Sequence, residues 1–580
     1  MVKFLIIICA LICCGGSQVR SDTENHRYKA GDPVPLYVNK VGPCQNPSES
    51  HSYFDLPFCQ PDNFKKRKRT LSELLSGDNL IKAPYELEFL ADKMFEVACT
   101  KTLTKEEVSQ FREAINRNYY FQMYYDDLPI LESIGEKYNN GGYTYILHTN
   151  IHFEILFNKD RVVEIKIRFI PGLGADITED KEKCVDFVYC VEWKEVDTAF
   201  EKRMEKYHVE FNWFPIINTC ETLVVMIGFL LKFYIRALKK GFSESMQEER
   251  GLRCIQEDVF TFPVHKSLLA AALGSGTQLF TLTILILILG VAGMFSPHNR
   301  VPLLTALIII YTITSSVAGY TATSIYCHLE GTNWLRNLLL TGCLFTGPLL
   351  FTFCLLNSIA SRPSTYKASV ALPFGTIIEF VLIWTLFATP LLLLGGFIGK
   401  NSKAEVQAQC QNNKDELKAF LNGIKICRKT LKVPWYRRSL PQMALAGFLP
   451  FTAIFVELSY VFSSLWGHRI YIQYKFLFVT FILLLITIAL VNVGLICCKI
   501  VSKDHKWWWR SFVCGGSIGL YVYGFCIHYY YNRSDWTGSL QLSFFFGYMG
   551  CICYGLFLMF GTVGFVSSYL FLRHIYHSLS

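Results

Sequence analysis

The sequence predicts a polytopic α-helical membrane protein of nine transmembrane helices, preceded by an N-terminal lumenal domain built as a β-rich sandwich. Three observations lead to this fold class. Long apolar segments follow one another from Trp213 to Tyr576, and 51% of the 580 residues are hydrophobic. Segments of about 20 apolar residues match a hydrocarbon core about 30 Å thick, which a helix can cross because it satisfies its own backbone. Residues 21–212, in contrast, are charged and Tyr-rich, with apolar and polar residues in alternation.

The predicted spans also indicate how the chain is oriented. Their approximate bounds are 214–237, 267–295, 301–323, 335–360, 372–398, 442–466, 473–499, 511–531 and 542–572. The loops on one side of these spans carry 22 Lys and Arg residues, and the loops on the other side carry 6. Because cytosolic loops are enriched in Lys and Arg, the first set is predicted to be cytosolic. The net charge of +9 therefore reflects membrane topology, and nucleic acid is not a predicted partner.

The N-terminus supports the same topology. Lys3 precedes the apolar run Phe4–Cys14, and small residues follow it. Eleven apolar residues are too few to span a bilayer comfortably, so residues 1–20 are predicted to be a cleaved secretory signal. This signal places residues 21–212 in the lumen. An odd number of helices in residues 213–580 then places the C-terminus in the cytosol, as the charges require.

Within the lumenal part, apolar residues alternate with polar ones along three segments, Tyr143–Phe157, Val163–Phe169 and Val185–Trp193. This period of two predicts half-buried strands of an antiparallel sandwich. Thr104–Arg117 is predicted to be a helix, with its first residue as N-cap and a glutamate three residues later. The charged segment Lys194–Val209 is predicted to be a helical stalk that joins the sandwich to the membrane.

Five cysteines lie in the lumenal part: Cys44, Cys59, Cys99, Cys184 and Cys190. Disulfides are expected in an oxidising lumen, and Cys44–Cys59 and Cys184–Cys190 are plausible pairs. Sequence alone does not determine the connectivity, and one cysteine is left over. A zinc site is disfavoured because the lumenal part contains no CxxC pair. No metal ion and no cofactor is predicted.

Two other lumenal features allow a functional and a structural interpretation. His148 and His152 resemble a metal pair, but residues four apart on a strand are about 13 Å apart, too far to share one ion. A polar strand face is therefore favoured. The basic run Lys65–Arg69 is either a processing site for a basic-specific protease or a solvated loop, and the loop is favoured.

Three carboxylates fall within predicted spans. Glu221 lies near the lumenal end of its span, whereas Glu379 and Glu457 lie deeper. Carboxylates inside a membrane are costly and usually face the interior of a bundle or a wet cavity. All three are therefore candidate functional residues, and the structural alternative is a protonated or paired carboxylate that locks two helices together.

Small residues recur inside the spans, and Gly395 with Gly399 and Gly515 with Gly519 have GxxxG spacing. Such pairs let helix backbones approach closely. Packing within the bundle is favoured over contact with a client helix, but both interpretations stay open. The segment Gly515–Gly519 also matches the hydrolase pattern GxSxG. That chemistry requires a strand-to-helix elbow, and Ser517 lies inside an apolar helix, so a hydrolase is excluded.

Two sites of covalent modification are candidates. Asn532 begins the glycosylation sequon Asn532-Arg533-Ser534 on the predicted lumenal side, close to the membrane. Cys497 and Cys498, at the cytosolic end of their span, are either palmitoylated or buried thiols.

Short motifs distributed over nearly the whole mature chain together resemble the transmembrane-nine superfamily, the nonaspanins. They are Tyr28–Val34, Tyr37–Lys40, Phe54–Cys59, Tyr119–Pro129, Leu273–Gly276, Ala318–Tyr320, Gly331–Trp334, Leu372–Thr376, Pro434–Tyr436, Leu440–Met443, Gly447–Phe451, Trp466–His468, Asp504–Arg510 and Ser543–Tyr548. The resemblance implies a resident of Golgi and endosomal membranes that sorts other membrane proteins and supports adhesion or phagocytosis. It implies membrane-protein cargo, the lipid bilayer, and coat or sorting machinery on the cytosolic loops as partners. It implies no catalytic residue.

Two features depart from this family pattern. Family tails usually end in Lys-x-Asp or Lys-x-Glu, which engages coatomer for Golgi retention, whereas this sequence ends in His577–Ser580. Residues 411–432 form a longer and more basic cytosolic loop than is usual, and an added contact surface is one interpretation.

The sequence therefore supports two main hypotheses. In the first, the protein is a non-enzymatic sorting factor whose lumenal domain senses cargo ectodomains and whose Gly-rich helix faces accept cargo spans. In the second, it is a transporter or channel in which Glu379 and Glu457 line a polar path. The first is favoured because we find no inverted repeat of broken helices. An enzyme is disfavoured because no nucleophile–base or metal constellation is apparent.

Overall fold

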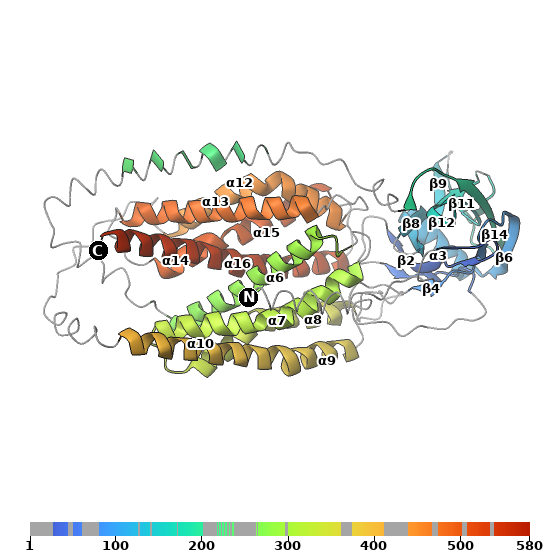
Figure 1. The fold of residues 1–580 in the computed structure, drawn as a ribbon. Helices are drawn as coiled ribbons and strands as arrows, with labels where there is room; N and C mark the ends of the chain where they lie inside the picture. The colour runs from blue at the N-terminus through green and yellow to red at the C-terminus, as the bar shows by residue number, and fades with distance from the viewer. Residues whose placement is uncertain are drawn as a thin grey trace, which may run out of the picture.

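The computed structural model describes residues 27–43, 50–60, 80–200, 263–295, 300–360, 374–410, 439–466, 474–500, 507–533 and 539–579, apart from a few single positions, and isolated residues between 217 and 236. An N-terminal β-rich domain lies beyond one end of a bundle of long helices (Figure 1). Eight helices of the described residues are long and apolar enough to cross a membrane. The predicted multi-pass helical membrane protein with an N-terminal β-rich domain is confirmed, while the count of nine helices and the lumenal side of the β domain stay predictions. The first of the nine predicted spans, at 214–237, lies largely outside the described residues.

The described spans agree with the last eight predicted segments. Two of them are interrupted: η5 is a π-helical turn between α9 and α10, and Ser517 separates α14 from α15. The elements are α6 (Lys266–Val291), α7 (Arg300–His328), α8 (Trp334–Ala360), α9 (Phe374–Ile383), η5 (Trp384–Ala388), α10 (Thr389–Cys410), α12 (Ser439–Trp466), α13 (Tyr474–Ile500), α14 (Trp508–Gly516), α15 (Ile518–Arg533) and α16 (Ser539–Leu579).

Helix α6 is the centre of the bundle. It packs against α7 and α8 on one side and against α13 and α16 on the other, two groups that Figure 1 shows and that also meet where α8 contacts α16. Apolar residues are distributed around all of its faces, as expected of a helix that is surrounded by other helices or lipid. Most residues of its first half are buried. Small residues permit this close packing. A Cβ added at Gly274 would lie 2.9 Å from the Ala318 oxygen of α7.

The β domain is built from short strands and one helix. In chain order they are β1 (Pro33–Val34), β2 (Tyr37–Pro43), β3 (His51–Ser52), the 3-10 turn η2 (Tyr53–Asp55), β4 (Ile81–Lys82), β5 (Leu87–Glu88), β6 (Lys93–Leu103), α3 (Lys105–Asn116), β7 (Tyr119–Tyr125), β8 (Leu128–Ser133), β9 (Gly135–Asn139), β10 (Tyr143–Leu147), β11 (Asn150–Asn158), β12 (Arg161–Phe169), β13 (Ala175–Asp176) and β14 (Lys183–Glu195).

Two sheets enclose one apolar core, as the predicted sandwich requires. One sheet has the order β3-β2-β7-β8, with β4 also paired to β2, and the other has the order β12-β11-β14-β6. Aromatic rings meet between the sheets: Phe121 of β7 lies edge-on to Phe169 of β12, with 6.4 Å between ring centroids. A small third sheet, β13-β10-β9, lies against α3, and β1 pairs with β5.

The prediction of a purely antiparallel sandwich is wrong at one pair, because β11 and β14 are parallel. Strand β12 runs antiparallel to β11, so the last residues of β12 lie beside the first residues of β11, at one end of the strands. Strand β14 then enters at that same end, and its sixth residue, Val188, pairs with Asn150, the first residue of β11. Side-chain alternation is the same in parallel and antiparallel strands, so the sequence pattern could not show this difference.

The prediction that Tyr143–Phe157 forms one strand is also wrong. The chain leaves the ladder at His148 and Thr149, so β10 joins the small sheet and β11 joins the sandwich. At the break, the His148 N–H donates to the Ile134 carbonyl at 3.0 Å, and the Thr149 carbonyl accepts from Val188 at 2.9 Å. The break contains two residues, which is one full period of strand alternation. The apolar residues of β10 and β11 therefore follow the same alternation, and the sequence pattern does not reveal the break.

The predicted helix is confirmed as α3. Thr104 caps it by accepting the Glu107 N–H at 3.3 Å, while a Glu107 carboxylate oxygen accepts the Thr104 N–H at 2.9 Å. This reciprocal pair satisfies two N–H groups that a helix start would otherwise leave unpaired. The predicted helical stalk is wrong at its beginning, because β14 continues through Glu195. Residues 201–209 lie outside the described part of the chain.

Candidate functional sites in the membrane helices and the β domain

The three predicted carboxylates lie in different surroundings. Glu457 is buried in α12, with 3% of its surface exposed. Glu379 is exposed in the second turn of α9, and Glu221 is exposed in a helical segment. The prediction that Glu379 lies deep and faces the interior is wrong, because α9 lies on the outside of the bundle with Ile378 and Leu382 also exposed. Figure 1 shows α9 and α12 on opposite sides of the bundle, so Glu379 and Glu457 cannot line one path.

The glycine pair of α10 packs against α7. A Cβ at Gly395 would overlap the carbonyl oxygen of Ser316, and one at Gly399 would lie 2.7 Å from the carbonyl oxygen of Tyr320. Real Cβ atoms do not approach backbone oxygens this closely. The two helices can therefore touch only because these side chains are absent.

The second glycine pair packs against α16. A Cβ at Gly515 would lie 2.5 Å from the Phe560 oxygen, and one at Gly519 would lie 2.7 Å from the Cys553 oxygen. Between them, the Ser517 hydroxyl is buried and donates to the Cys514 carbonyl at 2.6 Å. Both predicted GxxxG faces are thus occupied by helices of the same chain.

The predicted disulfide pairs are wrong. Cys59 is bonded to Cys99, whose Cα lies 6.0 Å from its own, and Cys184 and Cys190 are free thiols. Cys184 and Cys190 lie six residues apart on the continuous strand β14, which separates them by about 20 Å. Cys44 lies outside the described residues. The disulfide joins the segment after η2 to strand β6, so it ties together parts of the chain 40 residues apart.

The two histidines have separate surroundings. The His148 ring stacks on Phe169, with 4.0 Å between centroids, and its Nε2 lies 3.9 Å from a Glu136 carboxylate oxygen. His152 Nε2 lies 3.1 Å from a Glu192 carboxylate oxygen. Within the described ranges, no three His, Cys, Asp or Glu side chains gather in a way that could hold a metal ion.

The position of His148 predicts a pH dependence. Burial lowers its pKa, and the nearby Glu136 carboxylate opposes that shift. The folded domain therefore holds His148 neutral, while the unfolded chain binds a proton below its ordinary pKa of about 6.5. This contribution to stability is present above that pH and is lost as the pH falls through it. We expect hydrogen exchange in β11 and β12 of the full-length protein, corrected for intrinsic rates, to accelerate from pH 7.5 to pH 5.5.

A His148→Phe variant is the matched control for this effect, because it keeps a flat ring on Phe169 and removes the titrating group. We expect it to exchange at nearly the same corrected rate at both pH values. An equal acceleration in both proteins would show that His148 is not the responsible group.

The remaining modification and loop candidates are only partly described. Asn532 is exposed in the last turn of α15, and its side-chain nitrogen lies 3.0 Å from His528 Nδ1. The side chains of Cys497 and Cys498, the run Lys65–Arg69 and the loop 411–432 lie outside the described residues.

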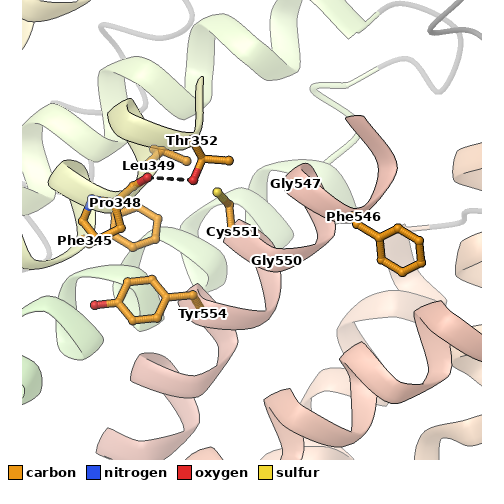
Figure 2. Close-up of a pocket in the computed structure, with 9 residues that line it drawn as sticks. All are labelled: Phe345, Pro348, Leu349, Thr352, Phe546, Gly547, Gly550, Cys551 and Tyr554. Carbon is orange, nitrogen blue, oxygen red and sulfur yellow. Dashed lines mark hydrogen bonds between the residues drawn. The ribbon is translucent and has the colours of Figure 1, made fainter. Parts of the chain in front are cut away.

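A groove of about 280 Å³ lies between α8 and α16 (Figure 2). Its lining carries no charge and consists of Phe345, Pro348, Leu349, Thr352, Phe546, Gly547, Gly550, Cys551 and Tyr554. Pro348 and Leu349 are exposed, so the groove reaches the outer surface of the bundle. A Cβ at Gly550 would have its nearest neighbour at 4.0 Å, so this glycine, unlike those of the GxxxG pairs, is not covered by another helix of the described chain.

A proline in α8 shapes this groove. Pro348 has no N–H to donate to the Leu344 carbonyl one turn earlier. The Tyr554 hydroxyl of α16 donates to that carbonyl instead, at 2.9 Å. Thr352 in turn donates to the Pro348 carbonyl at 2.9 Å, as Figure 2 shows. Tyr554 thus provides the missing hydrogen bond to the Leu344 carbonyl and holds α16 close to α8 on either side of the groove.

We expect Tyr554→Phe to cost about 1–3 kcal/mol of stability, because it leaves the Leu344 carbonyl without its donor. In a Pro348→Ala background the cost should be smaller, since the new backbone N–H can reach that carbonyl. The measurement is a double-mutant cycle of thermal unfolding on the detergent-solubilised protein. Equal costs in both backgrounds would contradict the role assigned to Tyr554.

An exposed apolar strip lies at the start of β6, the edge strand of its sheet. It consists of Leu90, Met94, Phe95 and Val97, whose exposed fractions are 45%, 84%, 57% and 58%. Leu90 and Phe95 have positive φ angles, 61° and 54°. The left-handed conformation costs a bulky residue about 1–2 kcal/mol. We call these four residues the β6 strip.

Comparison with known proteins identifies the family of this chain. Residues 50–539 match the model of the family described as Endomembrane protein 70. The chain belongs to the transmembrane 9 superfamily. Transmembrane 9 superfamily member 2 of Arabidopsis thaliana is 54% identical over 99% of this chain and 98% of its own length.

More distant relatives also cover nearly the whole chain. Transmembrane 9 superfamily member 1 of Bos taurus is 33% identical over 95% of this chain and 94% of its own length. A Dictyostelium discoideum protein named putative phagocytic receptor 1b is 34% identical over 100% of this chain and 99% of its own length. No solved structure matches the chain.

Sequence reasoning identified the transmembrane 9 superfamily but missed both the groove and the β6 strip. Pro348 is visible inside an apolar segment, but its partner Tyr554 lies more than 200 residues away. The strip was missed because Met94 and Phe95 are consecutive, which breaks the alternation of a strand. Two adjacent apolar residues next to an alternating segment are a signal for a bulge.

Proposed function

We propose that this protein is a non-enzymatic sorting factor of Golgi and endosomal membranes, which binds other membrane proteins and promotes their delivery to the correct membrane. Membership of an endomembrane family supports this proposal, and one relative carries the name of a phagocytic receptor. In the proposed topology the β domain is lumenal, the C-terminus is cytosolic, and coat or sorting machinery contacts the cytosolic loops.

The observation that carries the proposal is the groove between α8 and α16. It is uncharged and open to the outer surface of the bundle, where the surroundings are lipid tails or another protein's span. The glycine-rich helix faces of the GxxxG pairs are not free for a client, so client contact is assigned to Gly550 and the groove beside it. A volume of about 280 Å³ is too small for a helix, but it accommodates two or three apolar side chains of one.

A transporter or channel is the alternative function, and one observation disfavours it. The carboxylates that were predicted to line a polar path lie on opposite sides of the bundle, one buried in α12 and the other exposed on α9. Glu457 then fits a helix-locking role, while Glu379 lies near the end of its span and can reach water.

The experiment is surface proteomics of cells that lack this protein, rescued with wild type or with variants. Wild type should restore a defined set of surface membrane proteins. Gly550→Phe, which fills the groove, should fail to restore them, whereas Gly524→Phe should succeed because Gly524 is exposed and has no neighbour within 4 Å. Glu379→Gln with Glu457→Gln should also restore the set.

One outcome would overturn the sorting function, and two others would overturn the role of the groove in it. An unchanged surface together with altered lumenal pH or ion content would favour the transporter. Full rescue by Gly550→Phe would remove the groove from client contact. Labelling of the groove by a photoreactive fatty acid, without crosslinks to client spans, would identify an acyl chain as its occupant.

A further inference from the structure

The β6 strip is held in its exposed position by hydrogen bonds between backbone and side-chain groups. Trp193 fixes the preceding turn twice, since its N–H donates to Asp92 Oδ1 at 3.0 Å and its indole donates to the Ala91 carbonyl at 3.1 Å. The Phe95 N–H points to Cys190 Sγ at 3.4 Å, opposite a register shift between β14 and β6. The chain bulges there, and Met94 and Phe95 project away from the core.

This arrangement is costly in two ways. It exposes apolar surface, and it keeps both Leu90 and Phe95 in a left-handed conformation that bulky residues avoid. Glycine or asparagine at either position would relieve the backbone at no loss of core packing, because neither side chain is buried. Strained residues that contribute nothing to the core are typical of binding sites.

The surroundings of the strip are acidic. Residues 86–97 contain the four carboxylates of Glu86, Glu88, Asp92 and Glu96 and one basic residue, Lys93. The Lys93 ammonium lies 3.1 Å from a Glu88 carboxylate oxygen and 3.7 Å from one of Glu96, so its charge is compensated by residues beside the strip. An excess of negative charge remains beside the exposed apolar side chains. The complementary surface combines apolar groups with Lys or Arg.

The location of β6 argues against the bilayer around the helices as the occupant. Figure 1 shows β6 and β14 on the side of the β domain that faces away from the helices. A partner at this edge therefore lies outside that bilayer. An edge strand offers unpaired backbone groups to a protein segment as well as side chains.

We propose that the β6 strip binds segments of client ectodomains that combine exposed apolar side chains with Lys or Arg. This inference rests on the proposed sorting function and adds the chemistry by which the lumenal domain selects a client. Phe95 and Met94 provide the apolar contact, and Glu86 and Asp92 provide the charge.

The first test separates binding from stability. Phe95→Asn removes the ring and relieves the strain, because asparagine tolerates positive φ. The full-length variant should unfold at a higher temperature than wild type and yet deliver clients less well, with surface levels at least about fivefold lower, as expected for the loss of an interface aromatic. Leu173→Asn is the matched control, since Leu173 is 50% exposed elsewhere on the same domain. It should deliver clients normally.

The second test identifies the occupant. A photoreactive benzophenone side chain at position 94 of the full-length protein should crosslink, in cells, to the same proteins that disappear from the surface when this protein is absent. The crosslinked peptides should lie in their ectodomains and contain Lys or Arg. Charge reversal by Glu86→Lys should weaken these crosslinks.

The other outcomes overturn the inference. Crosslinks to residues 61–79 of the same chain would show that the basic run Lys65–Arg69 covers the strip. Full client delivery by Phe95→Asn would show that the strip is not a client site, although the sorting function would still stand. If no surface protein depends on this protein at all, the sorting function itself fails, whatever the strip binds.

Discussion

Gly395→Val is expected to prevent the helical bundle from assembling. The added Cβ would overlap the carbonyl oxygen of Ser316 in α7, and a backbone atom cannot move aside as a flexible side chain can. Helices α7 and α10 would have to separate along their length. Overpacking typically costs about 1–3 kcal/mol and sometimes more, and this contact between backbones belongs to the severe cases. The measurement is the yield of monodisperse, folded protein after solubilisation in detergent.

Two alanine substitutions in α15 provide a matched control for this argument. Gly519→Ala would place its Cβ 2.7 Å from the Cys553 oxygen, whereas Gly524→Ala would meet nothing within 4 Å. The first should lower the unfolding temperature, and the second should leave it unchanged or raise it slightly, because alanine favours a helix. If both substitutions had the same effect, close packing at the GxxxG faces would not explain these glycines.

Replacing both cysteines of the disulfide, Cys59→Ser with Cys99→Ser, is expected to destabilise the β domain by about 4 kcal/mol. The bond closes a loop of 40 residues and so lowers the conformational entropy of the unfolded chain. Its removal restores that entropy and favours unfolding. Peptide mapping without reduction should find Cys59 linked to Cys99. Hydrogen exchange of β6 and of the segment around η2 in the full-length protein should then accelerate in the variant.

Cys184→Ser is the control for this prediction, because Cys184 is an exposed free thiol on the same sheet. Its effect should stay within about 0.5 kcal/mol, as is usual for an exposed position. A mapped bond between Cys184 and Cys190 would contradict the geometry of β14, which holds these residues too far apart.

Much of the membrane architecture could be predicted because its physical cause is local. The bilayer demands a segment of given length and apolarity, so Phe476–Cys498 alone is enough to predict α13. The same holds for α3, whose capping pair Thr104 and Glu107 lies within one turn. Alternation along Val163–Phe169 likewise predicted β12. In each case the deciding interactions lie within a few residues of each other.

The errors concern contacts between distant parts of the chain. Cys184–Cys190 was a plausible pair, but one extended strand holds these residues apart, and Cys59 is bonded to a cysteine 40 residues away. Apolar surroundings suggested that Glu379 faces the interior, but sequence does not say which helix lies at the outside of a bundle. The same limit applies to Tyr554 and Leu344, which are 210 residues apart.

By itself, therefore, the sequence determined the class of fold, the family, eight of the spans, the charge bias between alternate loops and the strand pattern of the β domain. Only the tertiary structure decided which glycines are covered, which cysteines are bonded, and where the uncharged groove and the β6 strip lie. The physical reason is the range of the interactions. Hydropathy and capping act along the chain, whereas packing, disulfide geometry and exposure depend on which elements become neighbours in space.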